Sequence, residues 1–152
     1  MNPIQRIMVA VDFSEISMRL VRYALDLSPK LKAEVHLVHV INQRDIEAIR
    51  KVAEVTSAIS LPEQIEARRE DLLGALGAIL SELDAPPEVV GRHVTTGVPY
   101  EALISAIHNM DIDLLIMGTR GQGKFAGMLF GSTAARMLHK CPVPLLTLRN
   151  DA

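Results

Sequence analysis

The residues with the clearest chemical potential lie in one glycine-rich stretch, GTRGQGKFAGMLFGS, which runs from Gly118 to Ser132 directly after an apolar run. This stretch holds five of the nine glycines of the chain. Glycine lets backbone amides approach a ligand closely, and the free N–H groups at a helix start favour an anion. The stretch therefore predicts a phosphate-binding loop, with the hydroxyls of Ser132 and Thr133 as further donors.

Part of this stretch matches the phosphate loop of ATPases. Gly118, Gly123 and Lys124 match its G-x-x-x-x-G-K spacing. The next residue should be a Ser or Thr that holds magnesium, but it is Phe125, and the predicted helix starts several residues too late. The ATPase pattern is therefore rejected.

A dinucleotide-binding fingerprint does not explain the loop either. Gly121, Gly123 and Ala126 satisfy its spacing, but they lie in the middle of the loop instead of opening a helix. The nearest acidic residue downstream is Asp151, at the end of the chain.

The elements that must position this loop alternate between short apolar runs and amphipathic helical patterns, which is typical of an α/β fold. Strands are predicted at Ile4 to Val11, Glu34 to Ile41, Glu88 to Thr95, within Asp111 to Gly118, and at Pro144 to Arg149. Helices are predicted at Ser14 to Leu31, Ser60 to Leu83, Pro99 to about Asn109, and Ser132 to His139. The stretch from Asn42 to Ser60 is interpreted as a long connection with one short helix.

Local signals support two of the helix starts. Ser14 is a good N-cap for the first helix, and Ser60 followed by Glu63 forms a capping box for the second.

The strand patterns also predict where a ligand binds. Much of the first and fourth strands is apolar on both faces, as in the central strands of a covered parallel sheet, while the third strand is polar enough for an edge. In such sheets, ligands bind beyond the carboxyl ends of strands where the strand order reverses. If the first and fourth strands are neighbours, Asp12 and the glycine loop face one crevice.

Composition limits the class of protein. A chain of 152 residues with 49% hydrophobic and 22% charged residues predicts one globular domain over residues 1–152. A net charge of -2 without a basic stripe argues against a nucleic-acid partner. No apolar run is long enough for membrane insertion, and Asp12 interrupts the first run too early for a secretory signal, so a cytoplasmic location is expected. The single cysteine, Cys141, is interpreted as a small buried hydrophobe.

Two histidines, His36 and His39, lie three apart on a predicted strand. They point to opposite faces of the sheet, so they cannot share a metal ion, and both are interpreted as structural.

A third spacing fits every position of the glycine stretch. Gly118, Gly121, Gly131 and Ser132 form G-x2-G-x9-G-S, which resembles the ATP-binding motif of the universal stress protein family. The segments IMVAVDFSE, VHLVHV, GVP, DLLIMGTRG and CPVPLLTLR are also similar to that family. The resemblance implies a Rossmann-like α/β fold, with an open five-stranded parallel sheet of order 3-2-1-4-5 and helices on both faces.

The resemblance also implies nucleotide-binding roles for the matching positions. The adenosine would lie near Asp12, Met117, Gly118 and the backbone of Val40. The ribose and phosphates would lie near Gly121, Gly131, Ser132 and Thr133. Ala10 and Val11, which precede Asp12, also belong to the implied nucleotide-binding residues. Purely structural roles remain open for some of them, since Asp12 and Ser132 could be helix caps and Met117 could be core. Phe13 is bulkier than the residue often seen after this aspartate.

The function that the resemblance implies is that of a stress-response or regulatory protein, a switch or adaptor whose ligand is ATP, ADP or AMP, with Mg²⁺ carried by the nucleotide. No residue is placed to activate water, so slow ATP hydrolysis is the most that is expected. The alternative is a homodimeric adaptor that needs no nucleotide. Either protein would dimerise through the apolar edge strand from Pro144 to Arg149.

Overall fold

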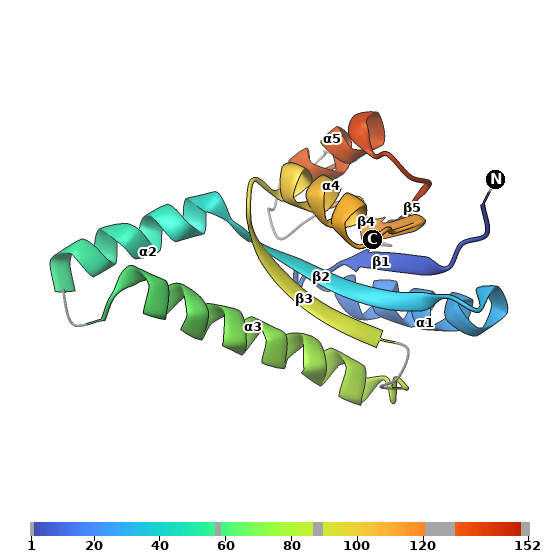
Figure 1. The fold of residues 1–152 in the computed structure, drawn as a ribbon, viewed down its shortest axis with the longest axis horizontal. Coiled ribbons are helices and arrows are strands. Elements are labelled where there is room, and N and C mark those ends of the chain that lie inside the picture. The colour runs from blue at the N-terminus through green and yellow to red at the C-terminus, as the bar shows by residue number, and fades with distance from the viewer. Residues whose placement is uncertain (1, 57–58, 87–89, 121–129, 150–152) are drawn as a thin grey trace.

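The computed structural model describes residues 2–56, 59–86, 90–120 and 130–149. Its strands are β1 (Arg6–Ala10), β2 (Glu34–Asn42), β3 (Val90–Gly97), β4 (Leu114–Gly118) and β5 (Leu145–Leu148). Its helices are α1 (Ser17–Leu31), α2 (Gln43–Thr56), α3 (Leu61–Glu82), α4 (Pro99–Asn109) and α5 (Ser132–Lys140). The strands form one parallel sheet of order β3-β2-β1-β4-β5, which confirms the predicted fold class (Figure 1).

The core lies on both faces of the sheet because the side chains of β1 alternate between two helical layers. Ile7 and Val9 pack with residues of α1 and α3 in one cluster, and Met8 packs with residues of α4 and α5 in another. All three side chains are 0% exposed. Burial of each contributes about 1.5–3 kcal/mol, so β1 is the central strand that its apolar sequence predicts.

The polar strand β3 lies at the edge of the sheet, as predicted, and only Val94 in it is fully buried. The start of α3 is also confirmed, because the Ser60 hydroxyl accepts a hydrogen bond from the Glu63 amide at 3.4 Å.

Two predictions about helices were wrong. The segment expected to be a connection with one short helix contains the 14-residue helix α2, which buries no side chain fully and extends with α3 beyond the sheet (Figure 1). Among the hydrophobic residues that pack against the core cluster in the described part of the chain, α2 contributes half-buried Ile46. The first helix begins at Ser17 and not after a Ser14 cap, because Phe13 takes a left-handed φ of 62° and redirects the chain.

Among the described helices, none combines the length and the apolar character that crossing a membrane requires.

Candidate functional site

The carboxyl ends of β1 and β4 form the point where the strand order reverses. β1 pairs with β2 on one side and with β4 on the other, so the connections that leave β1 and β4 run to opposite sides. Ala10 ends β1, and Met117 and Gly118 end β4. The fold therefore brings these three predicted residues to the same edge of the sheet, where a parallel α/β fold binds its ligands.

Val40 lies at this edge because β2 is longer than β1. The last residue of β1, Ala10, pairs with Val38, and the Val11 amide donates to the Val38 carbonyl at 2.9 Å. Backbone groups of alternate residues in a parallel strand point to the same side. The N–H and C=O groups of Val40 therefore point past the end of β1, toward the predicted crevice.

Asp12 organises the turn that leads from β1 to α1. Its Oδ1 accepts hydrogen bonds from the Ser14 amide at 2.9 Å and from the Ser17 hydroxyl at 3.3 Å. Asp12 therefore has a structural role, although not the predicted one of a helix cap. Its carboxylate closes the turn before α1, and the N-cap of α1 is Ile16. The Ser14 hydroxyl is buried at this turn and has no hydrogen-bond partner among the described residues.

The absence of a side chain at Gly118 leaves space for neighbouring residues of the protein. A Cβ added there would lie 3.1 Å from Cγ2 of Ile16 and 3.4 Å from the carbonyl oxygen of Arg120. The missing side chain therefore allows the turn before α1 to pack against the end of β4.

The two ends of the glycine loop are joined by backbone hydrogen bonds. The Gly131 amide donates to the Thr119 carbonyl at 2.7 Å, and the Thr119 amide donates to the Leu148 carbonyl at 3.1 Å. The Gly131 amide therefore serves to close the base of the loop.

The start of α5 retains the capacity to bind an anion. Gly131 is the N-cap, and its carbonyl accepts the first intrahelical bond from Ala135 at 3.0 Å. The amides of Ser132, Thr133 and Ala134 therefore have no partner within the helix, and the first turn holds no acidic residue. Three amides and two hydroxyls at the positive end of a helix dipole suit a phosphate group.

Several predicted positions differ in how accessible they are. The side chains of Val11 and Met117 are buried, and Met117 belongs to the core cluster under α4 and α5, so its open core role is realised. Arg120 is exposed. Gly121, Lys124 and Phe125 lie outside the described residues.

His39 is a residue of this edge that sequence reasoning treated only as structural. Its Nδ1 lies 2.7 Å from the carbonyl oxygen of Val11, and its ring lies 4.9 Å from that of Phe13. Because a carbonyl only accepts, Nδ1 carries the proton. Burial lowers the pKa of His39 below its ordinary value, and the bond to Val11 partly opposes this. Bulky Phe13 is thus accommodated against a neutral imidazole, a contact that no spacing in the sequence indicates.

Comparison with known proteins identifies the family. A model described as the universal stress protein family matches residues 3–149. The chain belongs to the universal stress protein family. The stress response protein NhaX of Bacillus subtilis is 24% identical to it, over 95% of this chain and 97% of the relative.

Solved universal stress proteins share the fold. Protein MJ0577 of Methanocaldococcus jannaschii gives a TM-score of 0.77 at 22% identity and covers 99% of both chains. A universal stress protein solved in complex with cAMP gives 0.67 at 19% identity, over 99% of this chain and 100% of that one. The protein from Archaeoglobus fulgidus in complex with dAMP gives 0.62 at 19% identity, over 96% and 98%. At these identities the likeness establishes the fold of this universal stress protein.

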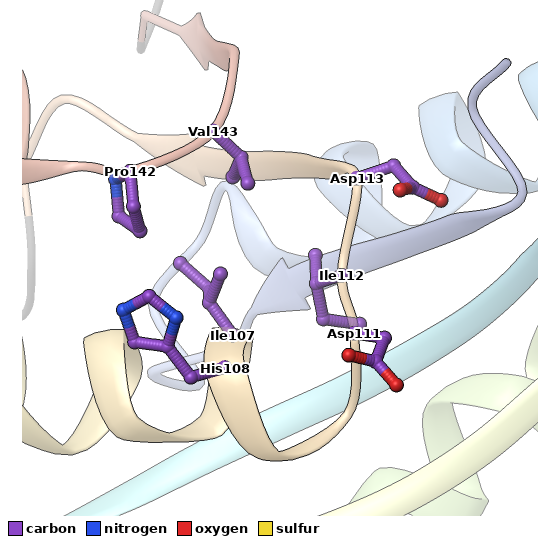
Figure 2. Close-up of a pocket in the computed structure, with 7 residues that line it drawn as sticks. All are labelled: Ile107, His108, Asp111, Ile112, Asp113, Pro142 and Val143. Atoms are coloured by element: carbon purple, nitrogen blue, oxygen red, sulfur yellow. The ribbon is translucent and has the colours of Figure 1, made fainter. Parts of the chain in front are cut away.

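A small cavity lies at the other end of the sheet and involves none of the predicted site residues. It has a volume of about 270 Å³ and lies where α4 leads into β4 and α5 leads into β5 (Figure 2). Asp113 lines this cavity, and its carboxylate accepts hydrogen bonds from the backbone amides of Gln5 and Arg6 at 2.8 and 2.9 Å. In this universal stress protein the cavity is therefore a packing feature of the amino ends of the strands.

Cys141 is half-buried beside the core under α4 and α5, and burial raises the pKa of its thiol above the ordinary value. A thiol of this kind is poorly nucleophilic, which agrees with its interpretation as a small hydrophobe.

Proposed function

We propose that this universal stress protein binds an adenine nucleotide, with ATP as the main ligand, in the crevice between β1 and β4. The observation that carries the proposal is the start of α5, where three backbone amides and the hydroxyls of Ser132 and Thr133 lie free of intrahelical bonds beside that crevice. A helix start contributes about 0.3–1 kcal/mol for each charge of an anion and more when it is partly buried. A chain of phosphates therefore gains more here than a single phosphate.

The adenosine half of the ligand would lie between Asp12 and β2. The backbone of Val40 offers one donor and one acceptor, which can pair with the edge of an adenine ring. The carboxylate of Asp12 would accept a hydrogen bond from a ribose hydroxyl, because an ionised carboxylate is an acceptor. Complexes of related universal stress proteins with cAMP and dAMP support a ligand of the adenine nucleotide class.

The role of the ligand would be regulatory. Mg²⁺ would enter with the phosphates, which are its usual ligands. The proposal requires no turnover of the nucleotide. Nucleotide binding would instead bias the conformation or the associations of a single domain that spans the chain.

Association would occur through β5. This strand lies at the edge of the sheet, and its residues, including three leucines, are only half-buried. An apolar edge strand of this kind is usually covered, and pairing with a second copy about a two-fold axis would cover it.

The test is calorimetric titration of the protein with ATP, ADP, AMP and cAMP, with light scattering to measure mass in each state. In Gly131→Val, a side chain would project at the loop base, and we expect the Kd for ATP to rise at least tenfold, or about 1.4 kcal/mol. The backbone at Gly131, with φ -70° and ψ 169°, is accessible to valine, so the fold should persist.

Gly74→Val is the matched control, because a Cβ at Gly74 meets no atom within 4 Å. Its affinity for ATP should equal that of the wild type. Absence of ATP binding in the wild type would favour the alternative, an adaptor that needs no nucleotide. An unchanged affinity for ATP in Gly131→Val would show that the phosphates do not bind at the start of α5.

A further inference from the structure

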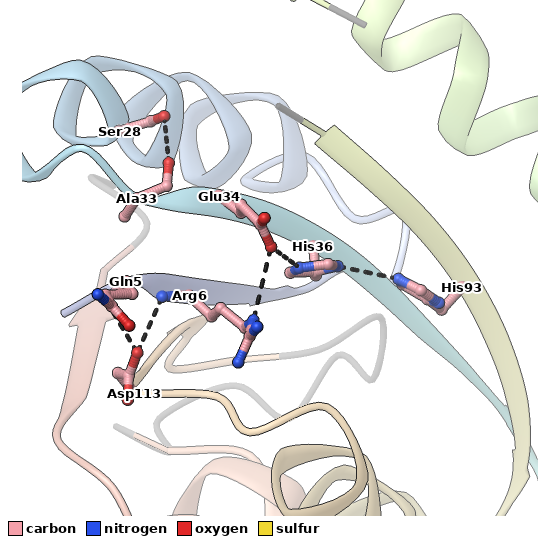
Figure 3. A network of polar contacts seen from close by, with 8 residues as sticks. All are labelled: Gln5, Arg6, Ser28, Ala33, Glu34, His36, His93 and Asp113. Carbon is pink, nitrogen blue, oxygen red and sulfur yellow. Dashed lines mark hydrogen bonds and ion pairs between the residues drawn. The ribbon is translucent and has the colours of Figure 1, made fainter. Parts of the chain in front are cut away.

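Two histidines meet at the amino end of the sheet, far along the strands from the proposed nucleotide site. Nδ1 of His36 on β2 lies 3.1 Å from Nε2 of His93 on β3 (Figure 3). The parallel register pairs His36 with Gly91, and His93 follows Gly91 by two residues, so both side chains lie on the same face of the sheet.

Gly91 is what allows the two rings to meet. A Cβ at this position would lie 2.8 Å from Nδ1 of His36 and 2.9 Å from Nε2 of His93. Both nitrogens therefore occupy the space directly over the Gly91 backbone, where any other residue would place its side chain. The pair is a built feature of β2 and β3.

Glu34 favours one tautomer of His36. Its Oε2 lies 3.3 Å from Nε2 of His36, and because a carboxylate accepts, that nitrogen is the one that carries the N–H. In the neutral ring this leaves Nδ1 of His36 as a lone pair that points toward His93. A proton carried on Nε2 of His93 completes the contact of the two nitrogens at 3.1 Å as a hydrogen bond, and a cation bound by both lone pairs is the other way to complete it.

We propose that His36 and His93 form a binding site for one divalent transition metal ion of the class that imidazole prefers, Cu²⁺, Zn²⁺ or Ni²⁺. The ion takes the place of the hydrogen bond between the two rings. Nδ1 of His36 and Nε2 of His93 each supply a lone pair, and the proton of the neutral His93 ring then lies on its Nδ1, so the number of bound protons does not change. Glu34 accepts from the remote nitrogen of His36 and thereby fixes the orientation of the ring, as carboxylates do beside many metal-bound histidines.

The spacing of the nitrogens suits such an ion. Two nitrogens about 2.0–2.1 Å from one ion lie about 2.9 Å apart at a right angle and about 3.3 Å apart at a tetrahedral angle. The observed 3.1 Å falls between these values, so the separation of the two nitrogens need not change when the rings turn toward a shared ion.

The surroundings of the two histidines limit the affinity of the site for the ion. Among the described residues, no three His, Cys, Asp or Glu side chains form a metal site, so water must complete the coordination. The His36 side chain is 19% exposed, which gives water access. The guanidinium of Arg6 lies 3.5 Å from the same Glu34 oxygen and offsets its charge, so the carboxylate orients His36 without adding net attraction.

The test uses the tag-free protein and Cu²⁺ alone, followed by electron paramagnetic resonance. We expect one equivalent of Cu²⁺ with hyperfine coupling from two imidazole nitrogens. In His93→Gln the amide group can still hydrogen bond to His36 but cannot ligate, and in His36→Asn the amide group replaces Nδ1 in the same way. Each variant should lose the spectrum of two coupled nitrogens, and its affinity for Cu²⁺ should fall at least about tenfold. His139→Gln, on the exposed surface of α5, should keep both.

A measurement on the wild type decides the question even if a variant does not fold. Substoichiometric Zn²⁺ should shift the imidazole nitrogen resonances of His36 and His93 and leave those of His39 and His139 in place. Equal Cu²⁺ affinity in the wild type and both variants, or Zn²⁺ shifts confined to other histidines, would overturn the metal site and assign the contact to a hydrogen bond alone.

Discussion

The two ends of the sheet are built by different means. At the carboxyl end, the proposed nucleotide site consists mainly of backbone groups, namely those of Val40 and of the first turn of α5. At the amino end, the proposed metal site consists of two side chains that come from neighbouring strands, with Gly91 beneath them. The first site depends on where strands and helices end, and the second depends on which residues the strand register places side by side.

This difference determines which substitutions each site tolerates. A backbone site survives many side-chain changes, provided that the turns around it keep their shape. A site made of side chains is lost when a substitution removes one ligating atom, while the fold stays intact. The predictions below use this contrast, in order of decreasing effect on stability.

The turn at Asp12 should be the most sensitive position. Asp12→Ala removes the acceptor for the Ser14 amide and for the hydroxyl of Ser17, which is 2% exposed. An unsatisfied buried group costs about 1–3 kcal/mol, so urea unfolding should show a loss of that size.

Asp12→Asn is the control, because it keeps Oδ1 and should stay within about 0.5 kcal/mol of the wild type. It replaces the other oxygen with a donor, so its affinity for ATP should fall. If Asp12→Asn binds ATP as the wild type does, Asp12 belongs to the turn alone.

The neutral state of His39 predicts a loss of stability in acid. Burial lowers the pKa of His39, while Asp12 and Asp45 raise it and Arg68 lowers it. The unfolded chain therefore binds a proton more readily than the folded protein as the pH falls below about 6.5. The free energy of unfolding should decrease there, by at most about 1.4 kcal/mol per pH unit from this group.

His39→Asn can still donate to the Val11 carbonyl but does not titrate. Urea unfolding between pH 7.5 and 5 should give a shallower dependence on pH for this variant. Parallel curves for the two proteins would show that His39 does not contribute to the acid sensitivity.

Gly91→Ala should separate metal binding from stability. The added Cβ would displace two ring ends, which can swing aside, while alanine restricts the unfolded chain, so the free energy of unfolding should change by less than about 1 kcal/mol. Copper binding should nevertheless fall at least about tenfold, because the nitrogens can no longer meet. A variant that keeps the two-nitrogen signal would show that the glycine is not needed for the pair.

The contrast between the two ends also explains what the sequence could predict. The alternation of strands and helices followed from apolar periodicity, which is a local signal along the chain. The order of the strands followed instead from the resemblance to universal stress proteins, which rests on the spacing of Gly118, Gly121, Gly131 and Ser132 and on the matching segments. The use of the Gly131 amide could not be predicted, because its partner, Thr119, is chosen when the two ends of the loop meet.

The histidines show the same limit more sharply. Spacing directs attention to His36 and His39, which lie on opposite faces as expected. The actual partner of His36 is His93, which is 57 residues away, and only the register between β2 and β3 brings them together. The length of α2 was missed for another reason, since most of its residues are polar and none of its side chains is fully buried.

That property of α2 has a consequence for how the chain can vary. A helix anchored by half-buried contacts opens locally at little cost, without disturbing the sheet that carries both proposed sites. Its exposed Val52 and Val55, at 58% and 84%, contribute little to the core. Substitutions and even insertions in α2 should therefore be tolerated better than anywhere else in the described helices, which makes it the segment most free to diverge between relatives while the sheet stays the same.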